Sequence, residues 1–255
     1  MTNEISLYGI ESLMEKISAY DKLSPRLARF EKLIREAKKK DDKFSRCINY
    51  LEMLSAQNQI QLFYVGGFLR DLWLGLKPRD IDIIFNSLSQ RSFEFAVNNK
   101  IVRRNRFDGL KLNIYGVNVD AWPIEKTWTF ENNYVLPKSI NRFPETTFLT
   151  VESLALEVYA PFDSRQGFEK GFFKACKEKV LELQRPENPF PNLQLIRTYS
   201  LQKKLEWKVG LNLREFIKRQ LETVNPNELA TLYEEHYNKK INGQTLYNSI
   251  RNLID

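Results

Sequence analysis

The chain has 255 residues, 42% of them hydrophobic and 13% aromatic, a composition that supports a buried core and excludes a largely disordered protein. Its 39 Lys and Arg residues exceed its 32 Asp and Glu residues, so the net charge of +7 is compatible with a polyanionic partner. No apolar run reaches membrane-spanning length and the first residues are too polar for a signal peptide, so we expect a cytoplasmic protein without a membrane partner.

The first 58 residues are predicted to form a helical extension. Apolar side chains recur there at the spacing of a helix face, at Ile10, Leu13, Met14 and Ile17 and again at Leu27, Phe30, Leu33 and Ile34. Ser24 before Pro25 is typical of a helix start between these two groups. The sequence assigns no role to this extension.

Residues 59–150 are predicted to form a domain built on a small mixed sheet. Leu62–Val65 is a short apolar run that is typical of a buried strand. A second strand is predicted from alternating apolar residues, at Ile81, Ile83 and Phe85. Tyr115 and Gly116 separate two further strand-like runs and predict a hairpin turn.

Residues 151–255 return to helical periodicity and are predicted to form a helical neck and C-terminal region, which makes the chain an α+β protein. His236, the only histidine, lies in the run YEEHYNKK and is expected on a solvated helix surface. A zinc site with several histidines is therefore excluded. The two cysteines lack metal-ligand spacing, and we expect both to be reduced.

Gly66 and Gly67 lie in the run VGGFLRDLWLG, where the first predicted strand passes into a helix. Without side chains, this turn lets backbone N–H groups approach a phosphate, and the start of a helix favours negative charge. The apolar face that follows predicts a short helix, which Gly75 would end. We therefore expect the two glycines to bind phosphate groups.

Three acidic residues are candidate metal ligands. Asp80 and Asp82 are two positions apart, so on a strand both point to one face. An Asp-x-Asp pair alone is more often a solvated strand face, but Asp120 in YGVNVDAWP adds a third outward-facing carboxylate. Three carboxylates facing a phosphate-binding turn suit two-metal phosphoryl transfer, with two Mg²⁺ ions or Mn²⁺ as the alternative.

The run VGGFLRDLWLG followed by RDID resembles the head-domain signature of the CCA-adding enzymes and bacterial poly(A) polymerases, a branch of the polymerase-β nucleotidyltransferase superfamily. TTFLTVESLALEVY, PFDSRQGFEKGFFKACKEKVLEL and LQLIRTYSLQKKLEWKV are more weakly similar to later segments of that family, so the resemblance covers roughly residues 61–210. It implies that residues 59–150 are a nucleotidyltransferase head that takes an NTP and extends an RNA 3′ end, such as that of a tRNA.

The same resemblance implies roles for individual residues. Asp80, Asp82 and Asp120 would be the catalytic metal ligands, and Gly66 and Gly67 would contact the triphosphate. Arg70 and Asp71 would support the nucleotide and the metal site. An ion pair between Arg70 and a neighbour such as Asp71 is the alternative to a direct phosphate contact.

The chain departs from the family at several positions. Glu145, Thr146 and Thr147 stand where the family has Arg-Arg-Asp, and Glu152-Ser153 replaces Asn-Ala. The family's base-selecting Glu-Asp-x-x-Arg motif has no convincing match. The identity of the nucleotide and of the acceptor therefore stays open. Alternative acceptors are a small molecule, a protein side chain or a second nucleotide, as in a second-messenger synthase or a toxin. A non-catalytic RNA-binding module is the competing class.

Two basic groups are candidate nucleic-acid contacts, with Arg103, Arg104, Arg106 and Lys111 in the first and Arg197, Lys203 and Lys204 in the second. An ordinary solvated face is an equally good interpretation of each group. Trp122 is expected at the rim of the site, and Trp207 in the core.

Overall fold

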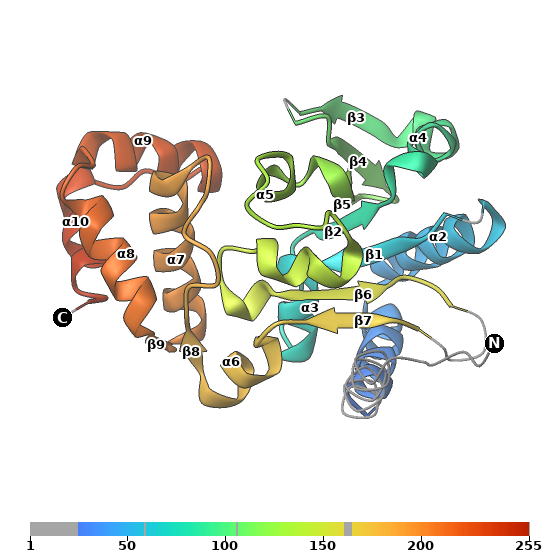
Figure 1. Ribbon diagram of the computed structural model, residues 1–255, viewed down its shortest axis with the longest axis horizontal. Coiled ribbons are helices and arrows are strands. Elements are labelled where there is room, and N and C mark those ends of the chain that lie inside the picture. Colours follow the sequence, from blue (N-terminus) through green and yellow to red (C-terminus); the bar gives the residue numbers. More distant parts are fainter. Residues whose placement is uncertain (1–24, 59, 106, 161–164, 255) are drawn as a thin grey trace, which may run out of the picture.

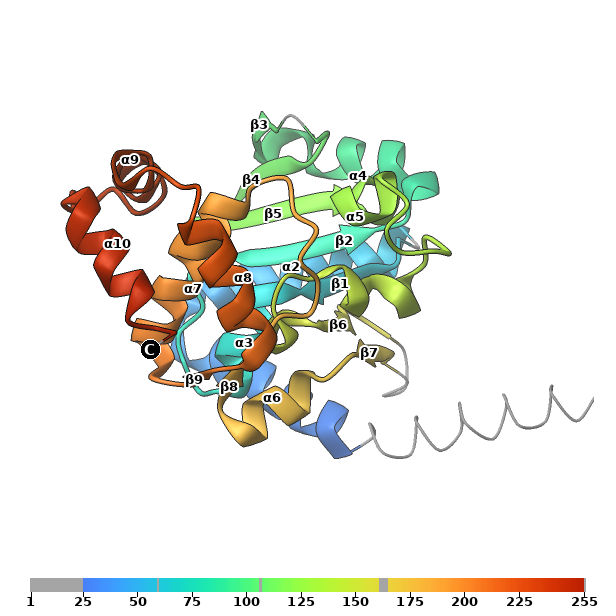
Figure 2. The same cartoon turned by 60° about the vertical axis from the view of Figure 1, so that its left-hand side comes forward.

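The computed structural model describes residues 25–58, 60–105, 107–160 and 165–254. Within these residues the chain is a mixed α+β structure, so the predicted class is confirmed. A twisted sheet forms the centre, helices cover one of its faces, and a group of helices near the C-terminus lies beyond one end of its strands (Figures 1 and 2).

In the described part of the chain, seven strands form the main sheet in the order β3-β4-β5-β2-β1-β6-β7. Their bounds are β1 Leu62–Val65, β2 Ile81–Phe85, β3 Ile101–Arg104, β4 Leu110–Ile114, β5 Val117–Pro123, β6 Leu154–Glu157 and β7 Gly167–Glu169. Neighbouring strands are antiparallel except β2 and β5, which are parallel. A two-stranded parallel sheet pairs β8 (Val180–Leu181) with β9 (Lys208–Val209).

Residues 25–40 are helical. The other α-helices are α2 Asp42–Asn58, α3 Gly66–Trp73, α4 Gln90–Val97, α5 Trp128–Glu131, α6 Phe172–Glu178, α7 Pro191–Leu205, α8 Leu211–Leu221, α9 Pro226–Tyr237 and α10 Gly243–Arg251. Short 3₁₀ turns are η1 Ser87–Ser89, η2 Asn98–Lys100, η3 Ile124–Lys126, η4 Ile140–Thr146 and η5 Thr150–Glu152. Residues 25–58 are thus almost entirely helical, as predicted, whereas the expected helix of residues 10–17 lies outside the described residues.

Several local predictions are confirmed. Leu62–Val65 is strand β1 and is buried along its whole length. Tyr115 and Gly116 join β4 to β5 with φ values of 53° and 84°, the left-handed pair that a two-residue hairpin turn requires. Gly75 follows α3 with a φ of 71°, and Trp207 is buried.

Strands β6 and β7 lie in the region after residue 150 that was predicted to be helical, so the prediction is wrong for these residues. Leu154–Glu157 pairs with β1 inside the sheet and is buried at every position, so it lacks the alternation that marks a half-exposed strand. Residues 154–157 and 167–169 therefore extend the sheet, and the helical neck starts later. The domain boundaries themselves stay a prediction.

The two faces of the sheet are covered differently. On one face, Tyr64, Ile81 and Ile83 pack into the large core that also contains side chains of residues 25–40, α2 and α4. On the other face, Phe63, Val65 and Ile84 pack against Phe130 and Phe143 from the segment that follows β5. We call this second side the front face, and its part nearest the C-terminal helices carries the site.

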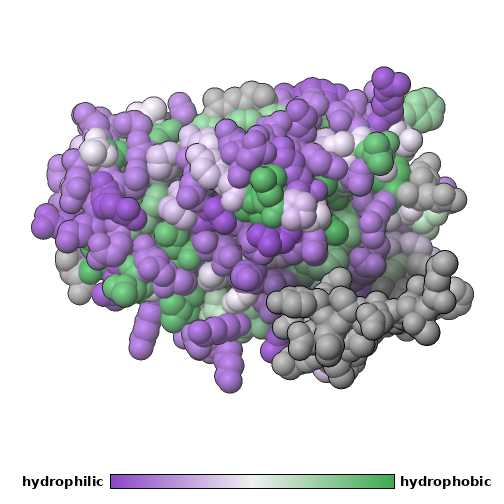
Figure 3. All heavy atoms as spheres, in the orientation of Figure 1, coloured by the Kyte–Doolittle hydropathy of each residue, from purple (hydrophilic) through white to green (hydrophobic). Residues whose placement is uncertain are grey.

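The exterior is mostly hydrophilic on the side seen in Figure 3, with hydrophobic side chains only scattered over it. Among the described helices, none combines the length and apolarity needed to cross a lipid bilayer.

Candidate active site

The Gly66–Gly67 turn joins β1 to α3 directly against an acidic side chain. Gly66 has a φ of +64°, and a Cβ added there would lie 3.3 Å from Oδ2 of Asp82. A Cβ on Gly67 would lie 3.2 Å from Nη2 of Arg70. The missing side chains therefore let the first turn of α3 lie against β2, and the predicted phosphate turn and the predicted acids meet at one place.

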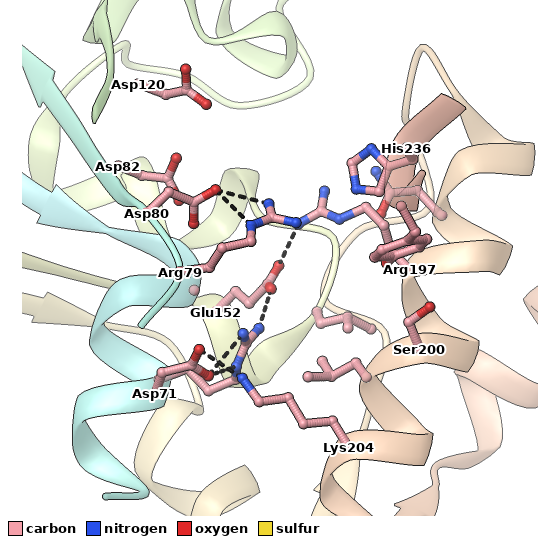
Figure 4. Close-up of a pocket in the computed structure, with 16 residues that line it drawn as sticks. Asp71, Arg79, Asp80, Asp82, Asp120, Glu152, Arg197, Ser200, Lys204 and His236 are labelled. Atoms are coloured by element: carbon pink, nitrogen blue, oxygen red, sulfur yellow. Dashed lines mark hydrogen bonds and ion pairs between the residues drawn. The ribbon is translucent and has the colours of Figure 1, made fainter. Parts of the chain in front are cut away.

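The three predicted acids lie on the two central strands that face this turn. Asp82 on β2 stands directly opposite Asp120 on β5, and Asp80 comes just before β2. Paired residues on neighbouring strands point to the same face. All three acids line one cavity of about 510 Å³ together with Gly67 (Figure 4).

Two of the acids have cationic partners, and the third has none among the described residues. Asp80 accepts hydrogen bonds from Nε and Nη2 of Arg79 at 3.0 and 2.8 Å. Both oxygens of Asp120 accept from Nζ of Lys111, at 2.7 and 2.8 Å. Asp82 forms no ion pair within the described residues, and burial together with the nearby charges of Asp80 and Asp120 raises its pKa to about 7.

This set of oxygen donors suits a hard divalent cation. Three acids concentrated at one wall repel one another, and a cation between them would relieve the repulsion that raises the Asp82 pKa. In the described part of the chain, no three acidic, histidine or cysteine side chains are already gathered closely enough to form a metal site. Asp80 and Asp120 instead hold Arg79 and Lys111, whose cationic groups neutralise them here.

Arg70 and Asp71 belong to a chain of ion pairs that runs from α3 to α7. Arg70 is buried and donates to Asp71 at 3.0 Å and to Glu152 at 2.6 Å. Lys204 of α7 pairs with Asp71 at 2.8 Å, and Arg197 of α7 lies 3.5 Å from Glu152. The ion pair that the sequence left as an alternative for Arg70 is therefore present, and the network ties the glycine turn to α7 (Figure 4).

Helix α9 forms the wall of the cavity across from the acids. His236 and Tyr237 at its end line the cavity, and His236 points toward Arg197 in Figure 4. His236 is exposed, as predicted, while partial desolvation and the charges of Arg197 and Arg79 lower its pKa. Its place at the site was not predicted, because the packing of α9 across from β2 has no local signal in the sequence.

The predicted basic residues are distributed over different environments. Lys111, Arg197 and Lys204 lie at the cavity through the contacts given above. Arg103 is exposed at the edge of the sheet, and Arg104 pairs with Glu94 at 2.8 Å and with Asp108 at 2.6 Å. Lys203 is exposed and lies 5.9 Å from the ring of Tyr199. Arg106 lies outside the described residues.

Sequence reasoning missed several residues of the cavity wall, namely Arg79, Leu149, Gln194, Ser200, Leu201, His236 and Tyr237. Gln194 and Ser200 each lie three residues from Arg197 on α7, so this helical spacing was an available signal once Arg197 was singled out. Glu152 was noticed only as a departure from the family, and no signal in the sequence indicated its contact with Arg70.

A second, smaller cavity of about 250 Å³ adjoins the first. Both are lined by Gly67, Asp82, Glu152, Gln194 and Arg197. The second adds aromatic and polar side chains from several segments, namely Trp122, Phe143, Thr146, Thr147, Phe148 and Asn188. Trp122 thus lies beside the acids, near the rim where it was predicted.

No protein-family model matches the sequence, and no curated protein matches it either. Solved structures do resemble it. The Thermotoga maritima CCA-adding enzyme in complex with tRNA is 19% identical with a TM-score of 0.63, over 88% of this chain and 53% of that one. A CCA-adding enzyme with CTP is 20% identical with a TM-score of 0.65, over 88% of this chain and 54% of that one.

A complex of CCA-adding enzyme with ATP is 18% identical with a TM-score of 0.60, covering 84% of this chain and 51% of that one. The chain thus spans about half the length of the structures that it matches. Over most of its own length it has the fold of CCA-adding enzymes, in agreement with the resemblance of its Gly-Gly and Asp-x-Asp motifs.

Proposed function

We propose that the protein is a Mg²⁺-dependent nucleotidyltransferase, which transfers a nucleoside monophosphate from an NTP to an acceptor hydroxyl at the 3′ end of an RNA. One observation carries this proposal: Asp80, Asp82 and Asp120 line a single cavity with Gly67, and Gly66 lies against Asp82. The cavity volume of about 510 Å³ is within the range of small-molecule sites.

Different residues of the chain would bind the phosphate groups and the metal ions. The backbone N–H groups at the start of α3 would donate to phosphate oxygens beside Gly66 and Gly67. Asp80, Asp82 and Asp120 would hold Mg²⁺, which when bound activates the attacking hydroxyl and stabilises the leaving pyrophosphate.

Positive charge for the remaining phosphate oxygens is available on α7 and beside β2. Arg197 is 42% exposed and only loosely paired with Glu152 at 3.5 Å, so its guanidinium can turn toward a ligand. Arg79 is 68% exposed next to Asp80. Since the family's Arg-Arg-Asp segment is replaced here, these two arginines are the cavity's own candidates for phosphate contacts.

RNA and NTP as partners are supported by the neighbouring structures, which include complexes with tRNA, ATP and CTP. The net charge of +7 has the sign that a polyanionic acceptor requires.

The proposal is tested with Mg²⁺, each labelled NTP in turn, and total cellular RNA. Wild-type protein is expected to label RNA, and the variant Asp80→Ala/Asp82→Ala is not. Asp42→Asn, whose side chain is 85% exposed on α2, is the control for a surface substitution. Labelled small products without labelled RNA would replace the acceptor with a small molecule or second nucleotide. No NTP consumption by the folded protein would contradict catalysis.

A further inference from the structure

A row of four charged side chains crosses the front face of the sheet from its centre to its edge. Asp82 stands opposite Asp120, Asp120 opposite Lys111, and Lys111 opposite Arg103. Because partners on adjacent strands share a face, all four project to the side of the active-site cavity. The charge changes sign along the row, with two acids inside and two cations outside.

Arg103 takes its place in this row because β3 contains an irregularity. Ile101 pairs with Leu112, and the register then shifts so that Arg103 instead of Val102 faces Lys111. A bulge of this kind redirects a side chain to the other face. Without the shift, the front face at this edge would carry a valine.

The two neighbouring arginines of β3 therefore have different surroundings. Arg104 points away from the row and is held by Glu94 and Asp108. Arg103 is exposed and forms no ion pair with any described residue. Its charge is thus available to a ligand, whereas the charge of Arg104 is already neutralised.

The spacing of the row matches a chain of phosphates better than a compact ligand. Strands lie about 4.8 Å apart, so Arg103 is about 10 Å from Asp120 and about 14 Å from Asp82 along the sheet. A reacting hydroxyl beside the acids would leave any attached phosphate near Lys111, and a group at Arg103 would have to be at least one nucleotide further away. A ligand bound at the acids would have to extend across two strand spacings beyond Asp120 to meet Arg103, as a polynucleotide strand does.

We propose that this row is the entry path of the acceptor RNA, and that the phosphates upstream of its 3′ end bind Lys111 and Arg103. This inference rests on the proposed nucleotidyltransferase function and assigns the surface that would bind the RNA next to its 3′ end. The acids repel phosphates at the centre of the sheet. Arg103 attracts them further out, and Lys111 would do so when a metal ion takes its place at Asp120. The row would therefore hold the strand in one direction, with its 3′ end inward.

The test uses Arg103→Gln, with Arg91→Gln as the matched control because Arg91 is exposed on α4 and makes no ion pair with any described residue. Each phosphate contact to a single strand contributes a slope of about 0.7 in log affinity against log salt concentration. Loss of one contact therefore weakens binding of a single-stranded RNA about fourfold at 0.15 M salt and lowers the salt slope by about 0.7. Arg103→Lys is expected to restore both values.

In the transfer assay, Arg103→Gln is expected to raise KM for RNA by a similar factor while KM for the NTP and kcat at saturating RNA stay at wild-type values. If the wild type labels RNA but Arg103→Gln and Arg91→Gln behave alike in KM and salt slope, the entry path is wrong while the proposed function stands. If the wild type transfers nucleotide only to small molecules, the polynucleotide acceptor is wrong. If it transfers none, the proposed function itself fails.

Discussion

Replacing Asp82 with asparagine is expected to stabilise the metal-free protein, because the ionised wild-type carboxylate destabilises the folded state. The pKa of Asp82 rises from an ordinary value of 3.8 to about 7 through burial and the charges of Asp80 and Asp120. Because the pKa of this carboxyl is higher in the folded than in the unfolded state, the folded protein loses stability as pH increases from about 4 to about 7. Above that window the penalty is constant.

The size of the effect follows from the same pKa. A change from 3.8 to about 7 corresponds to about 4 kcal/mol of lost stability. Asp82 keeps part of its surface exposed, so solvent reduces this to about 2 kcal/mol. Asp82→Asn should therefore raise Tm at pH 8 by about 4–8 °C in a chain of this length.

Thermal unfolding followed by circular dichroism in EDTA, at pH 5.0, 6.5 and 8.0, measures this difference. The advantage of Asp82→Asn over wild type should grow from the lowest to the highest pH, while Asp42→Asn should show no such trend. Adding Mg²⁺ should stabilise the wild type more than the variant, because the cation relieves the repulsion among the acids. An advantage that is absent at pH 8, or equal at all three pH values, would refute the electrostatic account of Asp82.

Three other outcomes follow from the contacts of the site. Glu152→Gln should lower the free energy of unfolding, measured by urea denaturation, by about 2 kcal/mol, because the buried Arg70 loses one of its two anionic partners. A loss of stability no larger than that of an exposed Glu→Gln substitution would contradict this. Lys111→Met should raise the affinity for Mn²⁺ about fivefold, because Asp120 loses a competing ammonium whose interaction contributes roughly 1 kcal/mol. Electron paramagnetic resonance measures this affinity. An unchanged affinity would mean that the Lys111–Asp120 pair does not compete with the metal. Both cysteines are buried, and burial raises the pKa of each thiol to about 12, so iodoacetamide should label neither in the native protein at pH 8; rapid labelling would show that the surrounding core opens.

The glycine turn and the acids could be predicted from the sequence because each is a local pattern. Gly66 and Gly67 separate an apolar run from a helix face, and Asp82 and Asp120 each occupy the polar positions of a short alternating strand. The meeting of Asp82 with Asp120, in contrast, depends on the pairing of β2 with β5, two strands that are separated in the sequence by α4, β3 and β4.

The rest of the site depends on contacts between distant segments. His236 reaches the cavity only because α9 packs against α7, and Glu152 meets Arg70 only because η5 packs on α3. Neither contact produces a periodicity in its own segment. For the same reason β6 could not be distinguished from a buried helix, since all its side chains are covered.

The parallel pairing of β2 with β5 has a consequence for how the site can diversify. Parallel neighbours need a crossover, and here the crossover contains α4, β3 and β4, so the whole excursion lies between the strand of Asp82 and the strand of Asp120. Its surface carries Arg103, while the two acid-bearing strands are held together by their own backbone hydrogen bonds. If the proposed function is correct, insertions or substitutions between β2 and β5 would change which acceptor is selected without moving the carboxylates of Asp82 and Asp120.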